Sequence, residues 1–353
     1  MNTEHLKADA AGIRRAGELL RAGGLVGIPT ETVYGLAASA LNGTAVAKIF
    51  AAKGRPMDNP LIVHISALEQ IRMLVADFPE RAQKLAAAYW PGPMTIILPK
   101  SARIPDEVSA GLPTVAVRFP QHPVARAIID AAGCPLAAPS GNSSGKPSPT
   151  CAAHMWADMD GKIDAIVDGG DCGVGVESTV VTLATDRPRL LRPGGITLAQ
   201  LETVLGPVDV DPAVTDRLQE GQVATSPGMK YKHYAPNAEV SLVCGSSAAY
   251  AAYVNAHGGD RVYAMCFDED VPLLRVPHYS YGAAADAAAQ AHRLFDCLRE
   301  FDRIGAKRVY AHCPQRDGVG LAVYNRMIRA AGFSIIRCGN EPADESDNAL
   351  GKE

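Results

Sequence analysis

The chain has 353 residues, of which 47% are hydrophobic and 20% are charged, as in globular proteins that bury substantial cores. This length favours two domains, or three. The formal net charge of −4 provides no broad basic surface, which argues against wrapping duplex nucleic acid as the main task.

The eight cysteines form no CxxC pair, so a structural zinc site is not expected, and buried free thiols in a reducing cytosol are the simplest interpretation. The first 20 residues lack the continuous apolar core of a signal peptide. No run of 18 apolar residues occurs, so nothing is predicted to span a membrane. A cytoplasmic protein without membrane attachment is expected.

The first elements follow from apolar periodicity and end signals. Residues 10–22 are predicted to form a helix that ends at Gly23. A short strand, "LVGI", stops at Pro29. The next helix lies in "NGTAVAKIFAAKG", with Thr44 as its expected N-cap and Gly54 as its C-terminal stop.

Strands and helices then continue to residue 206. Strands are predicted in "PLIVHI", "MTIILP", "TVAVRF", "PLAAPS", "DAIVDGG", "STVVTLA" and "PRLLRP", and helices over 79–89, over 122–132 and in "TLAQLETVLG", which Thr197 caps. Because helices and strands do not alternate strictly, we expect an α/β domain over 1–206 with a mixed twisted sheet.

Residues 207–238 have weak periodicity and are predicted to be a linker. From Glu239 strands and helices alternate, which predicts a smaller Rossmann-like α/β domain over 239–345 and a tail over 346–353. The helices of this domain are expected over 247–257, near 282–304 and over 317–331. Its sequence lacks GxGxxG, so dinucleotide binding is not supported.

Two turns of the first domain carry residues suited to phosphate. "SGNSSGKPSP" misses the Walker spacing and has Pro147 in the hydroxyl position, yet its glycines, hydroxyls and Lys146 suit anionic oxygens. A plain surface loop is the alternative. In "AAKGRPMDNPL", Lys53 and Arg55 flank Gly54 and could clamp a phosphate, or simply oppose the dipole of the preceding helix.

Other polar side chains follow buried strands, where ligands of α/β sheets usually bind. They are Thr30, Glu31, Thr32 and Tyr34 in "IPTETVYGL", Glu177, Ser178 and Thr179 in "GVGVESTVV", and Arg192 in "LLRPGG". Arg118 in "TVAVRFP" requires a carboxylate or phosphate partner if it is buried. His64 in "LIVHIS" has the alternative of being a satisfied core residue. No HExxH, EF-hand loop or GxSxG nucleophile motif occurs.

In this order, "GIPTETVYGL", "KGRPMDNPLIVHI", "APSGNSSGKPSPT", "VESTVV" and "LLRPGG" resemble the YrdC-like threonylcarbamoyl-AMP synthase family. "SPGMKYKHYAP" followed by a small α/β domain resembles its longer, two-domain branch. The resemblance implies a nucleotidyltransferase that makes L-threonylcarbamoyl-AMP from L-threonine, bicarbonate and ATP and releases pyrophosphate. It implies Mg²⁺ bound through the ATP phosphates, without a protein side chain as metal ligand, and no protein nucleophile.

The resemblance also implies roles for individual residues. Threonine binding is expected at Thr32, His64, Arg118 and Ser178, and ATP binding at Lys53, Arg55, Asn59, Thr114, Ser140, Asn142, Ser148 and Arg192. Lys53 and Arg55 would act in catalysis by electrostatic stabilisation. The hypothesis for the linker is a lid over the cleft, formed by Lys230, Tyr231, Lys232, His233 and Tyr234. The alternative is that these aromatic residues only dock the linker on a domain surface.

The expected partners are the small-molecule substrates and the machinery that transfers the threonylcarbamoyl group to tRNA, with tRNA contact indirect or weak. An RNA-binding module that uses the same basic cleft remains an alternative, which a steep salt dependence of tRNA binding would support. Carbamoyl transfer from carbamoyl phosphate is another. YrdC-like domains with that activity lie in larger proteins whose zinc-finger-like and acylphosphatase-like segments are not visible here.

Overall fold

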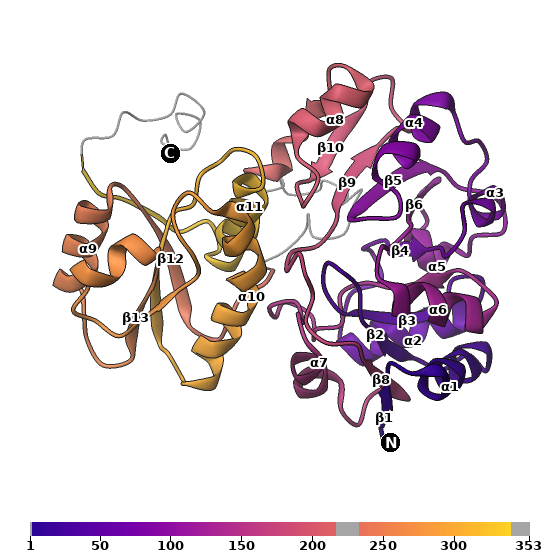
Figure 1. Cartoon of the computed structure of the whole chain (residues 1–353), viewed down its shortest axis with the longest axis horizontal. Coiled ribbons are helices and arrows are strands. Elements are labelled where there is room, and N and C mark those ends of the chain that lie inside the picture. The colour runs from indigo at the N-terminus through magenta and orange to yellow at the C-terminus, as the bar shows by residue number, and fades with distance from the viewer. Residues whose placement is uncertain (1, 217–232, 340–353) are drawn as a thin grey trace.

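The computed structural model of the chain describes residues 2–216 and 233–339. Three residues of the predicted lid, Lys230, Tyr231 and Lys232, and the predicted tail over 346–353 lie outside the described residues. Two α/β parts are seen side by side, the larger one formed by the N-terminal part of the chain (Figure 1).

The larger part is built on an 11-stranded sheet of order β1-β8-β2-β3-β7-β4-β6-β5-β9-β10-β11. Its strands are β1 (Glu4–Lys7), β2 (Val26–Ile28), β3 (Gly35–Ser39), β4 (Ile62–His64), β5 (Met94–Pro99), β6 (Thr114–Arg118), β7 (Leu136–Ala137), β8 (Ala165–Asp168), β9 (Thr179–Thr182), β10 (Arg189–Arg192) and β11 (Asp209–Val210). Its helices are α1 (Ala10–Arg21), α2 (Gly43–Lys53), α3 (Ile71–Leu74), α4 (Glu80–Tyr89), α5 (Asp106–Ser109), α6 (Pro123–Ala132), α7 (Ala152–Met159) and α8 (Leu198–Leu205), with 3-10 turns η1 (Leu68–Gln70) and η2 (Pro212–Val214).

The pairing in this sheet is mixed, which confirms the predicted fold class. β4 runs parallel to β6, with His64 opposite Arg118, whereas β5 runs antiparallel to β6. β11 pairs with β10 beyond residue 206, so the larger sheet extends into the segment predicted to be a linker.

The smaller part has a five-stranded sheet of order β14-β13-β15-β12-β16 in which every pair is parallel, as a Rossmann-like domain requires. Its elements are β12 (Glu239–Cys244), α9 (Ser247–Ala256), β13 (Val262–Cys266), η3 (Asp268–Leu273), β14 (His278–Ser280), α10 (Ala287–Arg303), β15 (Arg308–His312), α11 (Gly320–Ala330) and β16 (Ile335–Arg337). Helices α10 and α11 lie on the side that faces the larger part (Figure 1).

Capping residues explain which predicted helix boundaries agree with the structure and which differ from it. Gly54 adopts a left-handed conformation (φ 62°) and ends α2, as predicted. The N-cap of α2 is Asn42 and not Thr44, because the Asn42 side chain accepts from the amide of Ala45. Asp286 caps α10 in the same way, so that helix begins later than residue 282.

Several short elements were not anticipated, namely β1, β3, α3, α5, α7, β11, β14 and β16. They are short, and segments such as "GLAAS" carry little periodic contrast between apolar and polar residues.

The two parts share apolar packing. Val33 and Val176 of the larger part belong to the same buried cluster as Leu294 and Phe295 of α10. Such shared burial stabilises one arrangement of the two parts. Among the described residues, no helix is long and apolar enough to cross a membrane.

Candidate active site

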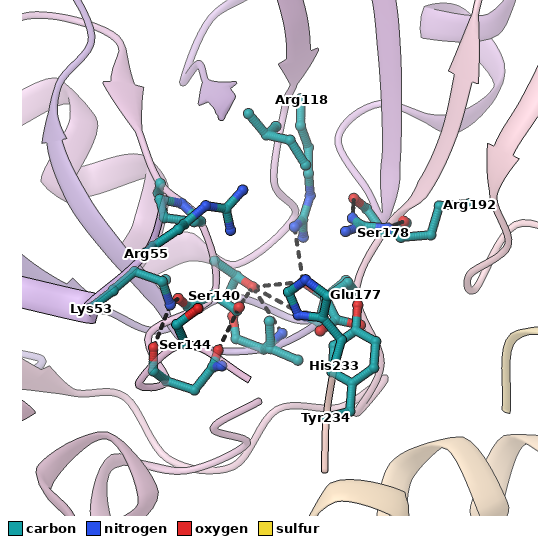
Figure 2. A pocket seen from close by; sticks show the side chains of 18 of the residues that line it. Lys53, Arg55, Arg118, Ser140, Ser144, Glu177, Ser178, Arg192, His233 and Tyr234 are labelled. Atoms are coloured by element: carbon teal, nitrogen blue, oxygen red, sulfur yellow. Dashed lines mark hydrogen bonds between the residues drawn. The ribbon is translucent and has the colours of Figure 1, made fainter. Parts of the chain in front are cut away.

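A cavity of about 50 Å³ lies where several strands of the larger sheet end (Figure 2). Its described lining includes these residues predicted from the sequence: Thr32, Lys53, Arg55, His64, Arg118, Ser140, Asn142, Ser178, Arg192, His233 and Tyr234. Segments far apart in the chain therefore converge on one space.

Sheet register explains this convergence. His64 ends β4 and Arg118 ends β6, and the two residues are opposite each other in parallel strands. Ser178 directly precedes β9, and Arg192 ends the antiparallel β10 beside it. Polar groups at these strand ends therefore lie at one edge of the sheet.

The Lys53 ammonium connects the turn that follows α2 to the serine-rich loop "SGNSSGKPSP", the two segments predicted to suit phosphate. Lys53 is the last residue of α2, and its Nζ donates to the main-chain carbonyl of Ser140 at 2.5 Å and to that of Asn142. The Ser140 hydroxyl in turn donates to Asn142 Oδ1 at 2.6 Å. The lysine thus holds the serine-rich loop against the helix.

Arg55, which is half-buried, and Arg192, which is buried, add two more cations. Arg55 donates to the carbonyls of Asn59 and Pro60 at 3.2 and 3.3 Å, and Arg192 Nε donates to the carbonyl of Ser178 at 3.0 Å. Burial lowers the pKa of both arginines to about 10 and lowers the pKa of Lys53 well below its usual value. Because burial penalises charge, cations concentrated here favour a multiply charged anionic ligand.

Arg118 has the carboxylate partner that its burial requires. Its Nη2 lies 2.7 Å from Glu31 Oε1, and its Nη1 donates to Thr32 Oγ1 at 2.8 Å. Thr30 and Thr32 share a hydroxyl contact of 2.9 Å. The sequence places Glu31 among the strand-end residues but predicts no role for it, because its pairing with Arg118 leaves no spacing signature.

His64 is 3% exposed, and its Nδ1 lies 3.2 Å from the carbonyl of Ile62. A carbonyl only accepts, so Nδ1 carries the proton and Nε2 is the acceptor nitrogen. Burial, with the nearby Arg118 cation, lowers the pKa of His64 to about 3. The ring is therefore neutral at pH 7.

Three residues predicted to bind ATP are not among the described residues that line this cavity: Asn59, Thr114 and Ser148. Ser148 lies close behind the lining, because its fully buried hydroxyl donates to Glu177 Oε1. Thr114 begins β6, whereas Arg118 ends it. Their predicted contacts with ATP remain predictions.

Glu177, which the sequence placed among the strand-end residues without a role, supplies a carboxylate to the lining. It accepts from Ser148 through Oε1 and from Arg326 of α11 through Oε2 at 2.9 Å. Burial raises its pKa, but Arg326, Arg192 and the Ser148 hydroxyl outweigh burial and hold the pKa below its usual value. The side chain is therefore a fixed anion among cations.

Metal ligands are scarce in the part of the chain that the structure describes. Among residues 2–216 and 233–339, no group of three or more His, Cys, Asp or Glu side chains is placed to hold a metal ion. Glu177 is the only carboxylate among the described lining residues, and both of its oxygens are engaged.

Comparison with known proteins agrees with this architecture. The family model Sua5_yciO_yrdC, described as "Telomere recombination", matches residues 18–194. The model described as "Threonylcarbamoyl-AMP synthase, C-terminal domain" matches residues 196–332.

Curated relatives match over nearly the whole chain. The threonylcarbamoyl-AMP synthase of Bacillus subtilis is 46% identical over 95% of this chain and 97% of its own length. That of Pyrococcus abyssi is 45% identical over 92% of this chain and 95% of its own length.

Solved structures match equally widely. The crystal structure of P. abyssi Sua5 complexed with L-threonine has a TM-score of 0.87 and 42% identity, covering 96% of this chain and 99% of that one. A double alanine variant of P. abyssi Sua5 gives a TM-score of 0.89 with 41% identity, covering 95% of this chain and 98% of that one. The chain therefore belongs to the threonylcarbamoyl-AMP synthase family, in its two-domain Sua5 form.

Proposed function

We propose that this protein joins L-threonine, bicarbonate and ATP to give L-threonylcarbamoyl-AMP and pyrophosphate, the first step of threonylcarbamoyl-adenosine formation in tRNA. The observation that carries the proposal is one cavity lined by the buried cations Lys53 and Arg192 and by the half-buried Arg55, with Arg118 beside them, in a chain of this family.

The reaction is a nucleotidyl transfer in two steps. The amine of threonine attacks the carbon of CO2 supplied by bicarbonate and loses a proton, which gives a carbamate. A carbamate oxygen then attacks the α-phosphorus, the bond to the β-phosphate oxygen breaks, and pyrophosphate leaves. Both reactants are anions, so orientation and charge neutralisation provide the catalysis, and no protein nucleophile is needed.

The residues divide into two groups. Lys53, Arg55 and Arg192 neutralise the triphosphate, and the loop that contains Ser140 and Asn142 supplies hydroxyl and amide groups beside it. Around threonine, the guanidinium of Arg118 pairs with the carboxylate, while hydroxyls recognise the side chain. Thr32 and Ser178 supply these hydroxyls, and neutral His64 accepts a hydrogen bond through Nε2.

Mg²⁺ is proposed to arrive on the phosphates of ATP. Because Glu177 is engaged with Ser148 and Arg326, the donor set of the described lining suits a metal whose ligands are mainly phosphate oxygens and water. When bound, the ion would neutralise charge on the leaving pyrophosphate.

A closing segment is part of the proposal. A free volume of about 50 Å³ holds water-sized groups and not ATP, and His233 and Tyr234 occupy part of the lining. The ring of Tyr234 packs on Phe295 of α10 at 5.2 Å between centroids. We infer that these two residues move away when substrates enter and return to exclude water from the mixed anhydride.

The proposed reaction also indicates which partner would receive the product. The product is expected to pass to a threonylcarbamoyl transferase that acts on tRNA, and tRNA contact by this protein is indirect or weak. Free thiols at all eight cysteines suit a cytoplasmic location.

The test measures pyrophosphate release with ATP, Mg²⁺, bicarbonate and threonine. Release should require both threonine and bicarbonate, and valine, which has a methyl group in place of the hydroxyl, should support much less. Release that is independent of threonine would contradict the proposal. Strong, salt-sensitive tRNA binding without pyrophosphate release would favour an RNA-binding module.

A further inference from the structure

The side chain of Arg326 belongs to the small domain but reaches three acceptors in the large one, besides Asn325 Oδ1 of its own helix at 3.0 Å. Arg326 lies in α11 and is 0% exposed. Its Nε donates to Glu177 Oε2 at 2.9 Å, its Nη2 to the Glu177 carbonyl at 3.2 Å, and its Nη1 to the Pro193 carbonyl at 2.6 Å. All three acceptors lie in the larger domain.

These acceptors belong to two turns that pack directly on each other behind the cavity. A Cβ added to Gly194 would lie 2.3 Å from the amide nitrogen of Thr179 and 2.7 Å from the carbonyl oxygen of Glu177, so only glycine fits there. Arg326 donates to a carbonyl in each turn. A planar guanidinium with several fixed donors is well suited to hold two backbone segments together.

The same turns carry residues that line the cavity. Ser178 follows Glu177, and its hydroxyl contacts Thr95 Oγ1 at 2.8 Å and accepts from Arg192 at 3.1 Å. The other carboxylate oxygen of Glu177 accepts from Ser148, in the serine-rich loop. By orienting Glu177, Arg326 therefore affects both Ser178, predicted to bind threonine, and Ser148, predicted to bind ATP.

Arg326 also contacts the closing segment, because its guanidinium carbon lies 5.9 Å from the ring centre of Tyr234. That distance is within the range of a cation–π contact. One side chain of the small domain thus contacts a cavity carboxylate and a cavity aromatic ring.

We propose that Arg326 is a positioning residue for the reaction. Contributed by the small domain, it fixes the Glu177 carboxylate and the 177–178 turn in the arrangement that the substrates require. The cavity is therefore complete only when the small domain is docked. The kinetic part of this proposal rests on the proposed function.

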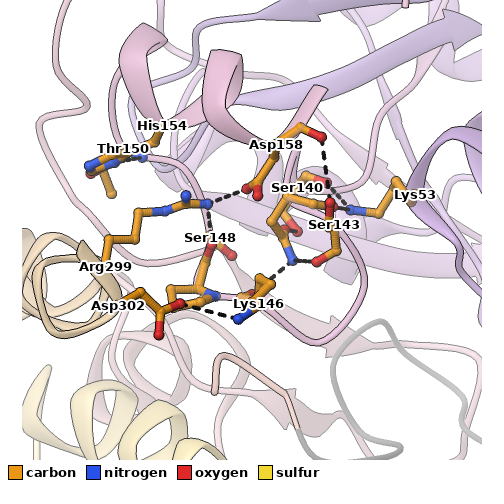
Figure 3. Close-up of polar contacts among 12 residues, drawn as sticks. Lys53, Ser140, Ser143, Lys146, Ser148, Thr150, His154, Asp158, Arg299 and Asp302 are labelled. Carbon is orange, nitrogen blue, oxygen red and sulfur yellow. Dashed lines mark hydrogen bonds and ion pairs between the residues drawn. The ribbon is translucent and has the colours of Figure 1, made fainter. Parts of the chain in front are cut away.

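Other contacts can keep the domains docked without Arg326. Arg299 of α10 pairs with Asp158 and donates to the carbonyl of Pro147 at 2.6 Å, and Lys146 lies 3.2 Å from Asp302 (Figure 3). An Arg326 variant should therefore remain a docked, folded protein with a disordered cavity wall, so a defect in positioning can be distinguished from a loss of docking.

The experiment compares Arg326→Met, Arg326→Lys and a matched control, Asp296→Asn. Asp296 also contacts the other domain, through His154 at 3.4 Å, but is not among the described lining residues. Arg326→Met should lower kcat about a hundredfold, as for misplaced groups of an active site. Its KM for threonine should change far less, Arg326→Lys should restore part of kcat, and Asp296→Asn should behave like the wild type.

A double-mutant cycle with Glu177→Gln separates positioning from general damage. If Arg326 acts through Glu177, the double variant should be no slower than the slower single variant. Additive losses, or a folded Arg326→Met protein with the kcat of the wild type, would overturn the proposal. Should Arg326→Met fail to fold, Arg326→Lys, which keeps the charge but loses the planar fork, takes its place in the cycle.

A readout without turnover keeps this inference separate from the proposed function. Hydrogen exchange followed by mass spectrometry should show faster exchange in peptides that cover 143–150 and 175–180 in Arg326→Met, but not in Asp296→Asn. Unchanged exchange in those peptides would overturn the positioning role even if the wild type proved to catalyse another reaction. Absence of threonine-dependent pyrophosphate release by the wild type would count only against the proposed function.

Discussion

The Lys53 ammonium donates to the main-chain carbonyl of Ser140 at 2.5 Å, although the two residues are 87 positions apart. This contact joins the C-terminal end of α2 to the serine-rich loop and places a buried cation at the wall of the cavity. An anion bound beside Lys53 would repay the cost of burying its charge.

Arg55→Ala should lower kcat by about tenfold or more, because it removes a half-buried cation from the wall proposed to face the phosphates. Lys48→Met is the control. Lys48 is also a cation of α2, but its Nζ donates to the carbonyl of Gly23, and it is not among the described lining residues. Pyrophosphate release under saturating substrates provides the measurement. Near wild-type turnover in Arg55→Ala would remove Arg55 from the phosphate site.

Arg118→Lys should raise the KM for threonine about tenfold while changing the KM for ATP much less. A lysine keeps the charge but loses the fork that contacts Glu31 and Thr32 and that matches a carboxylate. Initial rates over a threonine series at fixed ATP measure the effect. Arg15→Lys, which alters an exposed pair with Glu4, is the control. Equal increases in both KM values would argue against a separate threonine pocket.

The motif order predicted much of the candidate site, because several motifs lie at strand ends and strand ends meet at one edge of a sheet. His64 and Arg118 are examples, since parallel pairing places them opposite each other. Thr114 shows where proximity in sequence misleads. It lies on the same strand as Arg118, but four residues of extended chain separate the two by about 13 Å.

Contacts between the domains could not be read from the sequence. Glu177 and Arg326 are 149 positions apart, and neither local periodicity nor motif spacing links a helix of one domain to a turn of another. The all-parallel order of the small sheet was predictable from alternating strands and helices, but which helix face meets the cavity depends on docking. The sequence therefore predicted that a small domain exists, but not its proposed contribution to the cavity wall.

Stability should fall in acid because of His64. Its pKa is about 3 in the folded protein, compared with about 6.5 in the unfolded chain, so only the unfolded chain binds the proton between these values. The histidine therefore stabilises the fold fully above about pH 6.5, and this contribution decreases toward pH 3. The free energy of unfolding, measured with urea between pH 6 and 4, should fall less steeply in His64→Gln by about 1.4 kcal/mol per pH unit. Equal slopes in both proteins would mean that the buried ring is protonated in the fold.

Tyr234→Ala should uncouple pyrophosphate release from product accumulation. Tyr234 is 4% exposed, lines the cavity and packs on Phe295, so its loss should admit water to the mixed anhydride. Pyrophosphate and threonylcarbamoyl-AMP are measured in the same sample, and their ratio should rise well above that of the wild type. Tyr253→Ala, which removes a half-buried ring of α9 that stacks on the C-cap residue His257, is the control and should leave the ratio unchanged.

Truncation tests the same segment more severely. A chain ending at residue 206 lacks Tyr234, Arg326 and the small domain together, and also the edge strand β11 of the larger sheet, so its turnover should be lower than that of Tyr234→Ala, whose Arg326–Glu177 pair remains. The comparison needs both chains folded, which thermal unfolding establishes. If the truncated chain kept the turnover of the wild type and its ratio of pyrophosphate to threonylcarbamoyl-AMP, residues 207–238 would be only a tether. That result would contradict a closing role for His233 and Tyr234. A low turnover with the wild-type ratio of pyrophosphate to threonylcarbamoyl-AMP would show that exclusion of water does not depend on the missing segment. The loss of turnover would then be assigned to the cavity wall around Glu177.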